Sequence, residues 1–152
     1  MLSIKDKKVI SFLRKNARIS LTTLSKKTAI PVSTLYERLK AGEKDYILKH
    51  TSLLDFNKMG YGCRANVLIK IGRDDRANVK SYLSKCEYVN TLLKINNGYD
   101  FMFEAIFENI KTMEEFLEML DMKFKIKTKH VFYIIEEVVR EKFMAEPMFA
   151  SV

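Results

Sequence analysis

The chain has 152 residues, of which 47% are hydrophobic and 30% charged. This composition is that of an ordinary folded protein and fits one domain or two small ones. No apolar run approaches the roughly 20 residues that span a bilayer. The residues after Met1 also lack the apolar core of a signal peptide. We therefore expect a cytoplasmic protein that does not enter a membrane.

The positive charge is concentrated in the first third of the chain. Residues 1–55 hold 12 Lys or Arg and 5 Asp or Glu, a net charge of +7. Residues 56–152 hold 15 and 14, a net charge of +1. A small basic unit joined to a larger, nearly neutral one favours a nucleic-acid-binding module with a second domain. Charge alone would also fit a membrane-surface protein or a solvated coat of lysines.

Residues that could carry metal or catalytic chemistry are few and scattered. Cys63 and Cys86 have no CxxC spacing, and His50 and His130 lie far from them in the sequence. Neither a disulfide framework nor a zinc site is therefore expected. The sequence also has no Ser-His-Asp or Cys-His pattern and no phosphate-binding glycine loop. We expect no catalytic residue, no metal site and no cofactor, so the protein is not predicted to be an enzyme.

The first part of the chain is predicted to form short helices. Ser3 to Asp6 has the capping-box pattern, and apolar residues follow it at helical spacing. Ser20 is a good N-cap for a helix over residues 21–28, and a second helix follows over residues 32–40. Two short helices joined by about four residues indicate a helix-turn-helix. Residues 46–48 are expected to form a short extended segment.

Turn residues mark a boundary after this helical part. Asp55, Asn57, Gly60 and Gly62 lie close together within residues 53–62. We therefore predict a DNA-binding domain over residues 1–52, a linker over 53–62 and a second domain over 63–152.

The second domain has the order β-α-β-β-α-β, which predicts a ferredoxin-like α+β fold. Strict alternation over residues 63–71 indicates a half-buried strand, and residues 74–86 a helix. Strands over 88–95 and 101–107 enclose Asn97-Gly98, which favours a type I′ turn. A capping-box pattern at Thr112 to Glu115 opens the second helix, and residues 129–139 form the last strand.

This order leaves one face of the sheet without helices. Apolar residues occur at both alternations of VFYIIEEVV, residues 131–139, which indicates burial on both sides of the last strand. A second copy of the chain would supply the missing cover, so we expect a homodimer.

The sequence resembles the Lrp/AsnC family of transcriptional regulators. The likeness rests on Ala17-Arg18-Ile19-Ser20, Leu24-Ser25, Ala29-Ile30-Pro31, Thr34-Leu35 and Arg38-Leu39, on the linker LLDFNKMGY and on the final IIEEVV. It covers essentially the whole chain and implies a winged-type helix-turn-helix followed by a dimerisation and effector-sensing domain. Such proteins often form tetramers or octamers and respond to amino acids. The implied effector loop is Asn96, Asn97, Gly98, Tyr99 and Asp100.

The helix-turn-helix would place its second helix in the major groove of double-stranded DNA. We expect contacts to bases or phosphates from Ser33, Thr34, Tyr36, Glu37, Arg38 and Lys40, and contacts to the DNA backbone from Arg18, Ser20 and Thr22. Alternatively, Arg38 pairs with an acidic residue, and Ser33 caps a helix that begins after it. Asp100 could accept an effector's ammonium group or bond the turn backbone.

Two other functions remain open at this point. The β-α-β-β-α-β order also occurs in RNA recognition motifs, for which Phe101, Phe103 and Phe107 could provide stacking aromatics. A metabolite sensor with weak or lost DNA binding would also fit, because Pro31 stands where the family usually has a capping Ser.

Overall fold

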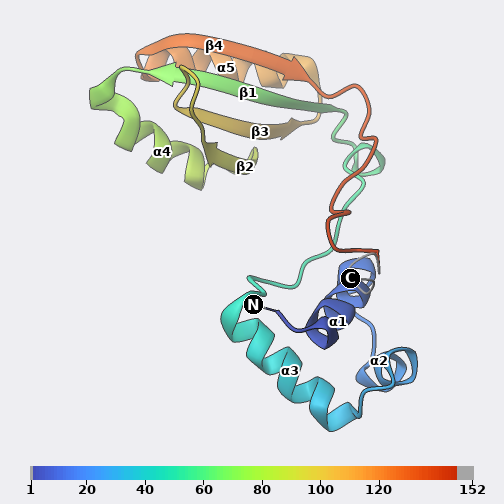
Figure 1. Ribbon diagram of the computed structural model, residues 1–152. Coiled ribbons are helices and arrows are strands. Elements are labelled where there is room, and N and C mark those ends of the chain that lie inside the picture. Colours follow the sequence, from blue (N-terminus) through green and yellow to red (C-terminus); the bar gives the residue numbers. More distant parts are fainter. Residues whose placement is uncertain (1, 147–152) are drawn as a thin grey trace. The chain divides into compact units, whose positions relative to one another are not determined.

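The computed structural model describes residues 2–146, which group into two compact units. One unit contains the chain up to Leu53 together with the segment from Val138 onward, and the other contains Leu54–Glu137. Figure 1 shows the helices α1–α3 in the first unit and the sheet with α4 and α5 in the second. The predicted end of the first domain at residue 52 lies beside this division, but residues 54–62, predicted to be a linker, belong to the second unit. However, the segment from Val138 belongs with the first unit, whereas residues 63–152 were expected to form one domain.

The first unit consists of α1 (Ile4–Lys15), α2 (Leu21–Thr28) and α3 (Val32–Asp45). The predicted capping box is confirmed, since the Ser3 side chain caps α1 and the Asp6 side chain bonds the Ser3 backbone. The predicted N-cap Ser20 is also confirmed. A small core joins the helices and contains four buried residues: Val9, Leu24, Ile30 and Leu35.

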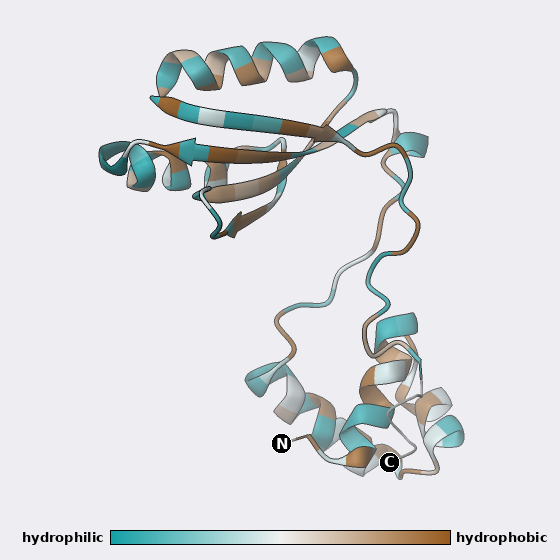
Figure 2. Ribbon diagram, turned by 45° about the horizontal axis from the view of Figure 1, so that its top comes forward, coloured by the Kyte–Doolittle hydropathy of each residue, from teal (hydrophilic) through white to brown (hydrophobic). Residues whose placement is uncertain are grey.

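The second unit is a four-stranded antiparallel sheet in the order β2-β3-β1-β4, as expected for a ferredoxin-like fold. Its strands are β1 (Cys63–Ile71), β2 (Val89–Lys94), β3 (Phe101–Phe107) and β4 (Ile126–Tyr133), and its helices are α4 (Arg76–Lys85) and α5 (Ile110–Lys123). Two short 3₁₀ turns, Asn57–Met59 and Arg73–Asp75, precede β1 and α4. Figure 2 shows the hydrophobic residues concentrated along the strands.

The core of this unit lies between one sheet face and the two helices. Alternate residues of β1 from Cys63 to Ile71 are buried, as the alternation predicted. They pack with Phe103 and Phe107 of β3, with Val79 and Leu83 of α4 and with the apolar stripe of α5. The other sheet face carries no helix within the described residues. The two helices cover one face of the sheet, and the other face is left available for a partner.

Several predicted boundaries need correction. Helix α5 begins at Ile110, and its N-cap is Asn109, three residues before the expected cap Thr112, because Asn109 Oδ1 accepts the Thr112 amide at 3.0 Å. The last strand ends at Tyr133 and not at Val139. The Ile134 amide makes the last hydrogen bond to β1, to the Arg64 carbonyl at 2.8 Å, and β1 begins only one residue earlier, at Cys63. Residues 46–48, expected to be extended, belong to no strand, and Tyr46 is the C-cap of α3, which ends at Asp45.

No helix within residues 2–146 is both long enough and apolar enough to cross a lipid bilayer.

Candidate nucleic-acid interface

The connection between α2 and α3 is tight and internally bonded. Ala29 ends α2 in the left-handed conformation with φ 57°, and its amide bonds the Ser25 carbonyl at 2.9 Å. The Ser25 hydroxyl donates to the Ile30 carbonyl at 2.7 Å. Ile30 and Leu35 are buried on either side of Pro31. These local bonds and the shared core hold α3 at a defined angle to α2, as a helix-turn-helix requires.

Helix α3 begins at Val32, with Pro31 as its N-cap and no side-chain cap at this helix start. Proline pre-sets the backbone for helix entry and has no amide of its own to satisfy. Ser33 and Thr34 therefore lie in the first turn, and both are exposed. The alternative in which Ser33 caps a later helix is wrong, which leaves its hydroxyl available to a ligand.

The rest of the solvent-facing side of α3 is polar and aromatic. Tyr36, Glu37 and Lys40 are exposed, while Leu35 on the opposite side is fully buried. The Lys40 ammonium lies 5.3 Å from the centre of the Tyr36 ring. Its hydrogen bond and charge interaction with Tyr36 raise the pKa of Lys40, which is cationic at neutral pH in any case. One helix face thus presents hydroxyl, aromatic and cationic groups together, the chemistry of DNA contacts.

Arg38 does not belong to this exposed face. Its guanidinium NH1 lies 2.5 Å from Asp6 Oδ1 and 3.3 Å from the Ser3 hydroxyl. The two charged side chains are only 30% and 19% exposed. Arg38 is therefore placed as an internal link between α3 and the start of α1, and not where base contact was expected. Arg38 lies between the buried stripe and the polar face of α3, so its side chain could turn toward either one. The contact with Asp6 turns it toward α1.

Partial burial raises the pKa of Asp6, but hydrogen bonds from Ser3 and Arg38 lower it by more, and the net pKa is lowered. The Asp6 carboxylate therefore stays ionised at neutral pH and holds Arg38. The link was missed in the sequence because the two residues are 32 positions apart.

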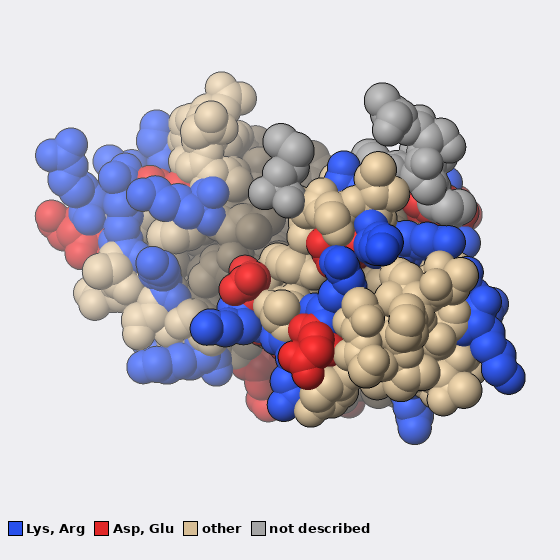
Figure 3. Space-filling view, turned by 60° about the horizontal axis from the view of Figure 1, so that its bottom comes forward, with Lys and Arg blue, Asp and Glu red and all other residues tan. Residues whose placement is uncertain are grey.

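The expected backbone contacts cluster at the start of α2. The Ser20 hydroxyl accepts the Thr23 amide at 3.1 Å and donates to the Thr23 hydroxyl at 2.8 Å. Ser20 is thus occupied as a cap, while Thr22 and Arg18 are exposed beside it. Figure 3 shows Lys and Arg side chains, with Asp and Glu among them on one side, along the edge of an uncharged area on the nearer, helical unit. Lys and Arg side chains there would attract the phosphate backbone of DNA.

The predicted effector loop connects β2 and β3. Asn97 and Gly98 have φ of 60° and 88°, which confirms the positive values expected for a type I′ turn. Asn96, Asn97 and Gly98 are exposed, and the Tyr99 ring packs edge-on against His130 at 5.7 Å.

Asp100 at the end of this loop is bonded elsewhere in the fold. Its Oδ2 accepts the Ile71 amide at 2.8 Å, and its Oδ1 pairs with Arg76 Nε at 2.8 Å. Its side chain is only 13% exposed. Asp100 therefore ties the end of β1 and the start of α4 to the loop. This partner set differs from both expected ones, an effector ammonium and the turn backbone.

A helix-turn-helix with an exposed polar helix, joined to a ferredoxin-like domain, is the architecture of a DNA-binding regulator with a separate second domain. Residues 2–41 match the family described as winged helix-turn-helix DNA-binding. Over 149 residues the chain is 30% identical to an HTH-type transcriptional regulator of Pyrococcus abyssi, covering 97% of this chain and 100% of that protein. It is 27% identical to the regulator FL11 of Pyrococcus furiosus, covering 86% and 87% of the two chains.

Solved structures show the same fold over nearly the whole chain. LrpC of Bacillus subtilis superposes with a TM-score of 0.82 at 21% identity, covering 91% of this chain and 98% of that one. A transcriptional regulator of Neisseria meningitidis in complex with L-Met gives 0.85 at 19% identity, covering 92% and 94%. The chain belongs to the HTH-type transcriptional regulators, which bind DNA, and its fold is that of solved Lrp/AsnC regulators.

Proposed function

We propose that this regulator binds duplex DNA as a homodimer, with α3 in the major groove, and that an amino acid modulates its binding. The observation that carries the DNA-binding geometry is the exposed face of α3 above the buried Leu35. In this proposal Ser33, Thr34, Tyr36 and Glu37 meet base edges or phosphates. The cationic Lys40 meets phosphate, together with Arg18 and Thr22 at the start of α2.

Dimerisation is proposed through the sheet face that carries no helix. Register places Asn66 and Leu68 of β1 opposite Phe132 and His130 of β4, and Leu68 opposite Met102 of β3. Leu93 of β2 pairs with Met102 on the same face. Phe132 is 55% exposed and Leu93 is 46% exposed. Large apolar side chains at such exposure lose contact with water when a second copy packs on them.

Arg64 and Glu104, two charged groups on this face, already have partners. Glu104 accepts two bonds from Arg64, at 2.9 and 2.7 Å, and one from Asn90 at 2.6 Å. A hydrogen-bonded ion pair of this kind tolerates burial far better than a lone charge. A second copy can therefore cover this part of the face without separating Arg64 and Glu104 from their partners. A two-fold dimer would bind half-sites about one helical turn, roughly 34 Å, apart or a multiple of it.

An RNA-binding role is not supported by the placement of the aromatic residues. Phe101, Phe103 and Phe107 all face the helices and are 5%, 0% and 0% exposed. They cannot stack on bases, as an RNA recognition motif requires.

The DNA-binding assignment predicts distinct effects for two kinds of substitution. Thr34→Ala and Tyr36→Ala should each weaken binding to the preferred sequence by roughly 1–3 kcal/mol and relax the base preference at one position. Lys40→Ala should instead weaken binding to all sequences alike and reduce the salt slope by about 1. The measurement is selection of duplexes from random DNA, followed by titration of the parent and variants at several salt concentrations.

Lys111→Ala is the matched control, because Lys111 lies on α5 and its side chain is 87% exposed. It should leave affinity, base preference and salt slope unchanged. If purified protein showed no salt-sensitive DNA binding at all, a metabolite sensor that has lost DNA binding would be the better assignment.

The proposed effector site is the loop of Asn96, Asn97, Gly98 and Tyr99. Asn96, Asn97 and Gly98 are exposed, so the polar groups of this loop are accessible to the carboxylate of an amino acid. Asp100 has both oxygens engaged, so we assign it the role of holding the loop in place. The Neisseria relative was solved in complex with L-Met, which makes an amino acid the first class to test.

The effector proposal predicts a thermal shift. A bound amino acid at 100 times its dissociation constant should stabilise the protein by roughly 2.7 kcal/mol. The assay is a panel of the twenty amino acids, L-Met first, on the parent and on Tyr99→Ala. Loss of the shift in Tyr99→Ala but not in Lys111→Ala supports the site. A shift that survives in Tyr99→Ala would place the ligand elsewhere.

A further inference from the structure

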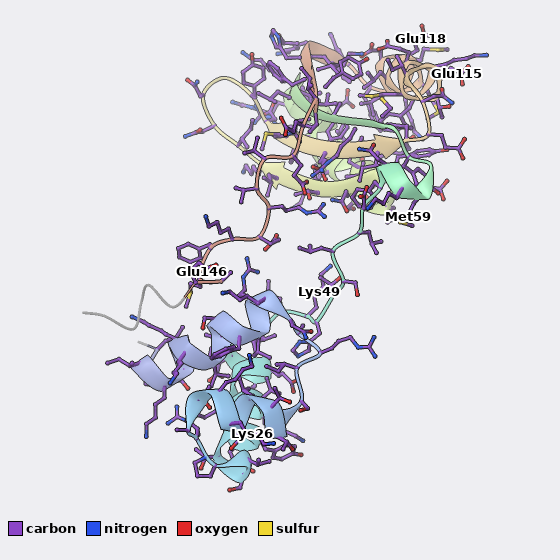
Figure 4. The ribbon with its side chains drawn as sticks, turned by 90° about the vertical axis from the view of Figure 1, so that its right-hand side faces the viewer. Lys26, Lys49, Met59, Glu115, Glu118 and Glu146 are labelled. Atoms are coloured by element: carbon purple, nitrogen blue, oxygen red, sulfur yellow. The ribbon has the colours of Figure 1, made fainter. Side chains whose placement is uncertain are left out.

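The segment Val138–Glu146, here termed the return segment, packs with the helix-turn-helix unit although it follows the second domain in sequence. Figure 4 shows Glu146, where this segment ends, beside the helices of that unit. The chain therefore crosses between the two units twice, once before β1 and once after β4. The helix-turn-helix unit is therefore connected to the second domain by two segments of the chain, here termed tethers. A simple linker would provide only one.

Arg14 of α1 is the main anchor of the return segment. Its Nε donates to the Phe143 carbonyl at 3.1 Å, and its NH2 donates to the Glu141 carbonyl at 2.9 Å. The same NH2 pairs with Glu141 Oε2 at 2.6 Å. One guanidinium thus holds two main-chain carbonyls and a carboxylate, a geometry that the planar fork of arginine fits and a lysine ammonium does not.

Further contacts hold the end of the segment. Lys15 pairs with Glu146 at 3.2 Å, and Ala145 is only 9% exposed. Glu141 and Met144 have φ of 56° and 60°, in the left-handed region that residues with a side chain rarely adopt. Such a conformation persists where the surrounding contacts hold it. Specific hydrogen bonds and ion pairs therefore hold the return segment to α1.

The other end of the connection is attached to the sheet. The Ile134 amide donates to the Arg64 carbonyl at 2.8 Å, and the Glu137 carboxylate pairs with the Arg64 guanidinium. Four residue steps separate Glu137 from Glu141, which Arg14 holds, so this crossing can span at most about 14 Å. Residues 54–62, at the start of the second unit, contain the 3₁₀ turn Asn57–Met59 and would span about 30 Å only if that turn opened and the segment were extended.

We propose that the return segment is the second tether that sets the spacing at which the dimer binds paired half-sites, with Arg14 and Glu141 as its positioning residues. This inference rests on the proposed dimeric DNA binding. When two linked modules bind one DNA, the second binding event depends on how well the tether matches the distance between the sites. A short tether selects one distance, whereas a long flexible one accepts several. The anchors thus act on spacing selectivity and not on base contacts.

The test compares DNA with one half-site to DNA with two half-sites at a series of spacings, using the full-length protein. Arg14→Ala should reduce the preference for the best spacing by about tenfold, because the tether lengthens. Glu141→Ala should reduce it by less, because the two bonds from Arg14 to main-chain carbonyls remain. Their affinity for a single half-site should stay within about twofold of the parent, because no base contact changes. Arg14→Lys, which keeps the charge but not the fork, should recover only part of the selectivity.

Matched controls separate tethering from loss of charge. Lys5→Ala removes an exposed cation from the same helix α1, and Glu136→Ala removes an exposed carboxylate just before the return segment. Both should bind every spacing as the parent does. Unchanged spacing selectivity in Arg14→Ala and Glu141→Ala would overturn the tether. If the parent protein did not bind the single half-site, the proposed DNA binding itself would be refuted. The two failures are therefore distinguishable.

Discussion

Phe132→Glu is expected to convert the dimer into monomers and to abolish tight binding to paired half-sites. Phe132 lies on the helix-free sheet face and is 55% exposed. In the proposed dimer a glutamate there would be buried without a partner, which costs several kcal/mol per subunit. In the isolated domain the same change is nearly neutral, because the side chain still meets water. The substitution therefore acts on association and leaves the fold intact.

Analytical ultracentrifugation or light scattering gives the mass, and circular dichroism shows that the fold is kept. The matched control is Met122→Glu, which adds the same charge at a side chain that is 89% exposed on the helical side of the domain. That control should remain a dimer and bind DNA as the parent does. If Phe132→Glu kept the dimer mass, another surface would have to form the interface.

Arg38→Ala is expected to destabilise the helix-turn-helix unit by roughly 1–3 kcal/mol, the cost of leaving a polar group without its hydrogen-bond partner. The loss arises because Asp6 keeps its partial burial but loses the guanidinium 2.5 Å away. Both partners keep some contact with water, which places the value below that of a fully buried pair. Chemical unfolding of the parent, Arg38→Ala, Asp6→Ala and the double variant gives the coupling between the two side chains.

The same pair predicts a dependence on pH. The pKa of Asp6 is lowered from its usual 3.8 in the folded protein, so the pair stabilises the fold above that value. This contribution is lost as the pH falls through the lower folded pKa, and Asp6→Asn should remove that part of the acid sensitivity. Lys44→Ala, at an exposed position of α3, is the control. If Arg38→Ala weakened DNA binding without any loss of stability, Arg38 would contact DNA after all.

Much of the fold follows from local features of the sequence. The capping box at Ser3, the N-cap at Ser20 and the alternation from Cys63 to Ile71 each depend on residues a few positions apart. The left-handed pair Asn97-Gly98 is equally local. Where a preference is set by near neighbours, the sequence pattern is enough to place the element. The exposed face of α3 was predictable for the same reason, because Leu35 fixes which side is buried.

The tertiary structure decided what depends on distant partners. Arg38 turns toward Asp6, Asp100 bonds Ile71 and Arg76, and the last strand ends where its neighbour β1 has no further residue to offer. Arg14 meets the return segment 127 positions later. A side chain on the border of a helix face has two directions of similar energy, and a carboxylate accepts any nearby donor. Only the folded chain brings close the distant partner that selects one direction or one donor.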